Sequence, residues 1–207
     1  MKNLGVIICI MALMMQVSSA QTMSLNKIFN ADNISVSNTG KKAVQQMESR
    51  KITFTSLPMS VAEVAPSQDA QQVAAYAVAA LARYETSKED AIAMLDALRG
   101  PRPLNGMDKQ FLQDRFRGKS YLMRSYFKGA TLQNNYTPAQ PYTVEVHENA
   151  YTYQEAGYAR FLISCGGADS PRPLTLRQKA STGEWFLWDY KGLLSGIRAP
   201  VAEDPWR

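Results

Sequence analysis

The stretch that decides the fold is SQDAQQVAAYAVAALARY, residues 67–84. Its apolar side chains recur at the three- and four-residue spacing of one helix face, which predicts an amphipathic helix with a buried stripe. The stripe consists of Val73, Tyr76, Ala77, Ala80 and Leu81. Ser67 is placed to cap the N-terminus of this helix, and the many alanines favour helix and allow close packing.

Two further helices are expected downstream. Ser87 begins a sequence close to a capping box, and the helix behind it should stop at Gly100, where Pro101 prevents continuation. Its expected buried residues are Ala91, Met94, Leu95 and Leu98. Asn105 can cap a third helix ending near Gly118. The inward side chains of that helix are expected to be Met107, Phe111, Leu112 and Phe116.

The apolar period changes after Gly129. Alternating or apolar runs predict four strands around residues 142–147, 158–165, 174–176 and 185–188, and residues 51–55 predict a first strand at a sheet edge. The short connection at residues 181–183 favours a hairpin between the last two strands. Large apolar side chains on both faces of residues 184–189 favour a central strand. Helices followed by antiparallel strands predict an α+β fold, with N-terminal helices packed on a curved, cone-like antiparallel meander.

The first twenty residues, MKNLGVIICIMALMMQVSSA, have the pattern of a secretory signal peptide. Lys2 supplies the positive charge, residues 4–15 form an apolar run, and Ser18 and Ala20 are small residues at the positions that signal peptidase reads. The run is shorter than the ~20 residues of a spanning helix. We therefore expect cleavage after Ala20, no retained membrane span, and export to the periplasm or the extracellular space.

Cleavage would leave a polar leader and one folded domain. Residues 21–50 lack periodicity and are expected to be flexible, whereas residues 51–207 are expected to form a single α+β domain. Loss of Lys2 would lower the formal net charge of +5 by one, and the basic residues are interspersed with acidic ones. A nucleic-acid partner is therefore not expected. Cys9 would leave with the signal peptide, so Cys165 would have no partner for an internal disulfide.

No catalytic or cofactor-binding set emerges from the sequence. His147 is the only histidine, and the exposed surface of a strand fits it better than the role of a general base. Cysteine and histidine cannot supply the four ligands of a structural zinc site, and no calcium-binding loop is present. Residues 166–170 lack the Lys-Ser/Thr of a phosphate-binding loop. We expect no cofactor, no metal and no catalytic residue.

A repeated tetrapeptide gives the most specific binding candidates. The segments 101–104 and 171–174 both read PRPL, so flanking prolines hold Arg102 and Arg172 in extended backbone. Two preset guanidinium groups can meet a carboxylate or phosphate of a ligand. The alternative, which we favour, is that the two arginines pair with acids of the domain itself: Asp169, Asp189 or Asp204.

Tyrosines around the start of the sheet, among them Tyr136, suit recognition of sugars or peptides, or else cover the open end of the sheet. These patterns favour a non-enzymatic accessory domain that binds a small molecule, a glycan or an envelope protein. The candidate binding residues are Arg102, Arg172, Tyr136 and Asp169. The alternatives are a hydrolase with Asp169 and Asp189 as its carboxylate pair, or a structural partner in an envelope assembly.

Five motifs together resemble a known family. They are GPRPL (100–104), NNYTP (134–138), GADSPRPLTLR (167–177), WFLW (185–188) and EDPW (203–206). As a set they resemble an uncharacterised domain-of-unknown-function family of bacterial exported proteins, over roughly residues 56–206. The resemblance implies a bacterial origin and a place in the periplasm or outside the cell. It implies no activity and no catalytic residue.

Overall fold

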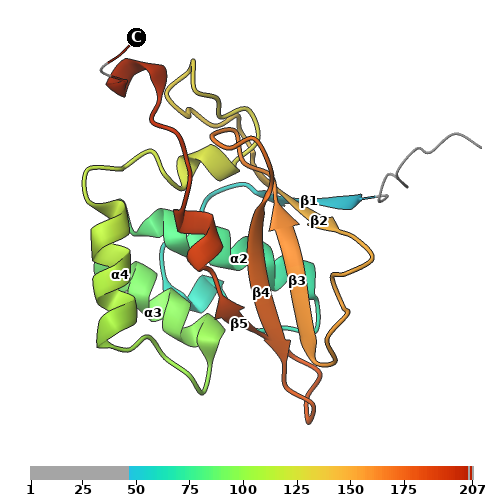
Figure 1. Cartoon of the computed structure of the whole chain (residues 1–207). Coiled ribbons are helices and arrows are strands. Elements are labelled where there is room, and N and C mark those ends of the chain that lie inside the picture. Colours follow the sequence, from blue (N-terminus) through green and yellow to red (C-terminus); the bar gives the residue numbers. More distant parts are fainter. Residues whose placement is uncertain (1–46, 205, 207) are drawn as a thin grey trace, which may run out of the picture. The chain divides into compact units, whose positions relative to one another are not determined.

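The computed structural model describes residues 47–204 and residue 206, and in it helix α2 (Ala70–Arg83) lies against a five-stranded sheet (Figure 1). The helix contacts every strand on one side and α3 (Lys88–Arg99) on another. It is consequently buried on almost all sides, with Val73, Ala77 and Leu81 fully inaccessible. The predicted helix is confirmed, and it forms the centre of the core.

The start of α2 differs from the prediction. Asp69, not Ser67, is the N-cap, and its carboxylate accepts a hydrogen bond from the Gln72 backbone at 3.1 Å. The Ser67 carbonyl instead accepts from the Trp185 backbone at 2.7 Å, which ties the segment before the helix to a strand. Ser67 therefore forms a β-bridge with Trp185, and Asp69, the next residue suited to capping, caps the helix.

Helices α3 and α4 (Gly106–Phe116) follow the predicted capping signals. Ser87 caps α3, Asn105 caps α4 in a capping box with Asp108, and Gly100 ends α3 with a positive φ of 57°. One expected inward residue is wrong: Met107 lies in the first turn of α4 and is 84% exposed. Leu112 is the apolar side chain of α4 that is fully buried.

The sheet is an antiparallel meander with the order β1-β2-β3-β4-β5. Its strands are β1 (Glu48–Phe54), β2 (Tyr142–Glu148), β3 (Tyr158–Ile163), β4 (Arg172–Gln178) and β5 (Trp185–Asp189). The helices are inserted between β1 and β2, and β1 forms one edge as predicted. This arrangement confirms the α+β fold. One face of the sheet covers α2 (Figure 1).

Strand β5 is an edge strand, which corrects the expected central position. Leu187 and Trp185 point into the core and are buried. Phe186 has the opposite orientation and packs against Gly100, so the loop after α3 covers the outer face of this strand. The apolar residues on the second face of β5 are thus partly covered by a loop and not by a further strand.

The expected flexible leader, residues 21–50, overlaps the first strand of the sheet. Strand β1 begins at Glu48, so residues 48–50 of the expected leader belong to the sheet. The rest of that leader and the expected signal peptide lie outside the described residues. Within residues 47–204, no helix has the length and apolarity to cross a membrane.

The contact between Gly100 and Phe186 is testable by adding one methyl group. A Cβ at Gly100 would lie 2.5 Å from the Phe186 ring, in addition to the strain of positive φ. We expect Gly100→Ala to lower the free energy of unfolding by about 3 kcal/mol. Gly118→Ala, where φ is also positive but the space is open, should cost only ~1–2 kcal/mol. Urea denaturation measures both, and equal losses would contradict the packing role.

Buried tyrosines predict loss of stability in alkali. Burial raises the pKa of Tyr136 to about 12 and also raises the pKa of Tyr126 and Tyr190 above the ordinary value of 10.0. The stabilisation from neutral phenols is therefore complete below pH 10 and is lost as the pH rises through the folded-state pKa values. Urea midpoints measured from pH 10 to about 12 should fall as the pH rises, and the decrease should be smaller in Tyr136→Phe. A flat profile in the unmodified protein would refute this.

Candidate functional site

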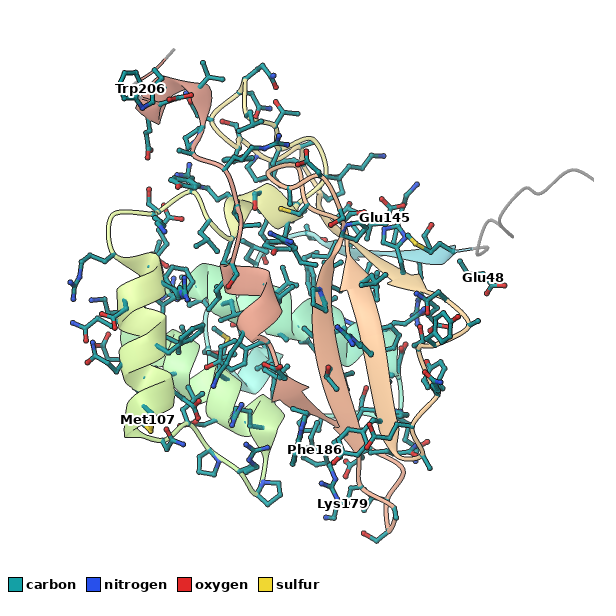
Figure 2. All side chains as sticks on the ribbon, viewed as in Figure 1. Glu48, Met107, Glu145, Lys179, Phe186 and Trp206 are labelled. Atoms are coloured by element: carbon teal, nitrogen blue, oxygen red, sulfur yellow. The ribbon has the colours of Figure 1, made fainter. Side chains whose placement is uncertain are left out.

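A basic, aromatic hollow of about 460 Å³ opens where the loop after α3 meets β4 and β5. We call it the arginine–tryptophan hollow. Its lining includes the basic residues Arg99, Arg102, Arg177 and Lys179 and the apolar residues Pro101, Phe186 and Trp188. Phe186 and Lys179 lie toward the end of the sheet that carries the β4–β5 hairpin, whereas Glu145 lies toward the opposite end (Figure 2).

Two guanidinium groups stack on the same indole ring in this hollow. The Arg102 guanidinium carbon lies 4.0 Å from the centroid of Trp188, and that of Arg177 lies 4.9 Å from it. Arg177 also donates a hydrogen bond to the Tyr158 hydroxyl at 2.8 Å, and Tyr158 meets Trp188 edge to face. Stacking on aromatic rings holds flexible arginine side chains in place. The two cations are therefore positioned before any ligand arrives.

Arg99 lines the hollow but is itself buried, with only 5% of its surface exposed. Its Nε atom donates to the Arg102 carbonyl at 2.9 Å, and one terminal nitrogen donates to the Trp188 carbonyl at 3.4 Å. The other terminal nitrogen lies 3.6 Å from Asp108, which neutralises its charge. One buried guanidinium thus joins the loop that carries Arg102 to the strand that carries Trp188.

The hollow has an uncompensated positive charge. Its lining contains no aspartate or glutamate, and Arg102, Arg177 and Lys179 form no ion pair with any residue in the described part of the chain. Most N–H donors of Arg102 and Arg177 are left for solvent or a ligand. A planar guanidinium binds carboxylate, phosphate or sulfate through paired hydrogen bonds. The arrangement is therefore suited to an anionic group attached to an apolar or planar body.

The two arginines of the PRPL repeat occupy different settings. Arg102 lies in the hollow described above, whereas Arg172 donates to the Ser195 carbonyl at 2.7 Å and passes over Gly196, whose added Cβ would overlap its guanidinium. Neither forms an ion pair with Asp169, Asp189 or Asp204, the expected internal partners. Arg172 makes an internal contact, and Arg102 stacks on an aromatic ring.

The other two predicted binding residues lie away from the arginine–tryptophan hollow. Tyr136 is fully buried, stacks on Tyr121 and donates to the Arg198 carbonyl at 3.0 Å. Its ring fills a small second core and offers no surface to a ligand. Asp169 is exposed and pairs with Arg198 at 3.0 Å.

Asp169 lines another hollow of about 380 Å³ at the far end of the sheet, which we call the Cys165 hollow. Ser164, in its lining, lies 2.6 Å from Nε2 of His147 and 3.4 Å from the Glu145 carboxylate. A nucleophile and a base within hydrogen-bonding distance are part of a hydrolytic site. No described residue, however, accepts a hydrogen bond from the second ring nitrogen of His147 to orient it.

A third hollow of about 730 Å³ lies on the sheet face that points away from α2. We call it the tyrosine hollow. Its lining includes Tyr151, Tyr158, Glu155, Arg160, Thr175 and Asp189. Asp189 and Asp169, the expected carboxylate pair, therefore line separate hollows. No group of three or more metal-ligating residues occurs within the described part of the chain.

Sequence reasoning identified Arg102 but missed Arg99, Arg177, Tyr158 and Trp188 as parts of one site. The available signal was the strand register, because Tyr158 lies directly opposite Arg177 on adjacent strands. In the sequence, Trp188 was part of a two-faced apolar strand and of the WFLW motif, and neither indicated a binding site. Ser164 was missed for the same reason, because its backbone pairs with Glu145 across the sheet.

Comparison with protein families places residues 42–201 in a family described as a domain of unknown function, DUF6935. The match spans most of the chain, so the protein belongs to this family. No curated protein and no solved structure matches the chain. The family description assigns no activity, and a bacterial, exported origin stays a prediction from the sequence.

Removing the Arg99 guanidinium should disrupt both the fold and the hollow. In Arg99→Met, Asp108 is left buried with its charge only partly compensated by Lys191 at 3.6 Å. We expect a loss of about 3–5 kcal/mol in the free energy of unfolding. Arg83→Met, which breaks the more exposed pair with Asp90, should cost below ~1 kcal/mol. Urea denaturation that gave similar losses for both would contradict the central role of Arg99.

Proposed function

We propose that this protein is a non-enzymatic binding domain that works outside the cytoplasm and holds an anionic group of its ligand in the arginine–tryptophan hollow. The observation that carries the proposal is the pair of guanidinium groups stacked on Trp188 without a neutralising carboxylate. The signal-peptide pattern of residues 1–20 supports the location.

Preorganisation is the physical reason that this surface suits binding. A free arginine loses much rotamer freedom when a ligand immobilises it, and that loss weakens binding. Here Trp188 and Tyr158 already restrict Arg177, while Trp188 and the flanking prolines already restrict Arg102. Most of the loss of side-chain rotamer entropy of these donors therefore occurs on folding, and little further loss opposes binding of the anionic ligand.

A hydrolase has weaker support in the geometry. Asp169 and Asp189 line different hollows, and Asp169 is engaged by Arg198. The contact between Ser164 and His147 is the one feature that favours such an enzyme, and the imidazole lacks an orienting acid among the described residues. A binding domain, in contrast, is supported by the two stacked guanidinium groups of the arginine–tryptophan hollow.

The proposal is tested by titrating the protein with two anionic probes, a short oligogalacturonate and hexaglutamate. We expect Arg102→Ala and Arg177→Ala each to weaken binding of at least one probe about tenfold, because each removes charge-assisted hydrogen bonds. Both side chains are exposed, so the free energy of unfolding should change little. Calorimetry and urea denaturation measure the two effects.

Arg115→Ala is the matched control, because Arg115 also stacks on an aromatic ring, Phe111 at 5.1 Å, but lies outside the hollow. It should leave the affinity unchanged. If it weakened binding as much as Arg102→Ala, the effect would be one of overall charge. If the double variant Arg102→Ala/Arg177→Ala bound both probes as the unmodified protein does, the hollow would not be the site.

A further inference from the structure

The tyrosine hollow adjoins the arginine–tryptophan hollow. Tyr158 lines the tyrosine hollow, and its hydroxyl and ring contact Arg177 and Trp188, which line the other hollow. The linings of the two hollows are therefore in direct contact at this group of side chains. A ligand that crosses Tyr158 contacts both.

The two hollows differ in charge. The tyrosine hollow contains the carboxylates of Glu155 and Asp189 and the single cation Arg160, whereas the lining of the arginine–tryptophan hollow contains no carboxylate. Glu155 is exposed and forms no ion pair with another described residue. Carboxylates repel a second anion but accept hydrogen bonds from neutral hydroxyl groups. The ligand portion in the tyrosine hollow should therefore be neutral and rich in hydroxyls.

The aromatic rings fit the same kind of ligand. Tyr151, which is 54% exposed, and Tyr158 both line the tyrosine hollow. Tyrosine offers an apolar ring face and a hydroxyl that hydrogen-bonds. Sugar rings present apolar C–H faces and hydroxyl edges. Volumes of about 730 and 460 Å³ lie within the range of small-ligand sites.

We infer that the ligand is an oligosaccharide in which an acidic sugar adjoins a neutral one. The carboxylate of the acidic sugar binds Arg102 and Arg177, and the neutral sugar lies beyond Tyr158, where its hydroxyls bond to Glu155 and its ring faces Tyr151. This inference rests on the proposed function, because it takes the arginine–tryptophan hollow as the anion site. A uniformly acidic chain, whether peptide or polysaccharide, fits less well because Glu155 and Asp189 repel it.

These ligands are distinguished by whether Glu155→Gln weakens or strengthens their binding. Hyaluronan oligosaccharides, which alternate acidic and neutral sugars, serve as the probe, and oligogalacturonate and hexaglutamate serve as uniformly acidic probes. We expect Glu155→Gln to weaken hyaluronan binding about tenfold, since it weakens the hydrogen bonds that hydroxyls make to a charged acceptor. The same change should strengthen binding of the uniformly acidic probes, because it removes a repelling charge. Tyr151→Ala should weaken only hyaluronan binding.

Glu89→Gln, at an exposed position on α3, is the matched control and should change no affinity. If Glu155→Gln strengthened binding of all three probes, the ligand would be a polyanion, and the inference would be overturned while the anion site stood. If neither Glu155→Gln nor Tyr151→Ala changed hyaluronan binding, the tyrosine hollow would not be a sugar site. If Arg102→Ala/Arg177→Ala changed none of the three, the proposed function itself would fail.

Discussion

The rest of the structure depends on burying α2 (Ala70–Arg83) on nearly all sides. A helix that is apolar around its circumference must be covered by more than one neighbour. The sheet covers one side and α3 covers another, and α3 also contacts β5. Its C-terminus then arrives beside β5, where Gly100 allows the chain to turn against Phe186. The position of the arginine–tryptophan hollow therefore follows from how the core helix is covered.

Much of the fold was predictable because its signals are local. Ser87, Gly100 and Asn105 mark helix ends through hydrogen bonds made within a few residues, and these predictions are confirmed. The edge position of β5 was not predictable in the same way. A strand with apolar residues on both faces indicates two covering layers, and the sequence does not say whether the second layer is another strand or a loop. In this protein the loop after α3 is the second covering layer, and its Gly100 packs against Phe186.

The site was less predictable, because identical tetrapeptides have unlike surroundings. In the first PRPL, Arg102 lies in a loop outside the sheet, where Trp188 is available for stacking. In the second, Arg172 begins β4 opposite Ile163, and this register directs it to the Ser195 carbonyl. Tyr158, Arg177 and Trp188 come together only through strand pairing. The repeat made both arginines candidates for an anion site without distinguishing them, and the different surroundings of the two segments leave only Arg102 in the hollow.

Arg99 orients the chain segments around the hollow, whereas other cations are exposed for binding. Replacing a buried ion pair by apolar side chains is often neutral or stabilising, so stability alone gives little reason for a guanidinium here. Its fork instead reaches the carbonyls of both Arg102 and Trp188, which no apolar side chain can do. Because Asp108 neutralises Arg99, the free positive charge of the hollow comes from Arg102, Arg177 and Lys179. The buried cation fixes the geometry, and the exposed cations remain available to attract the ligand.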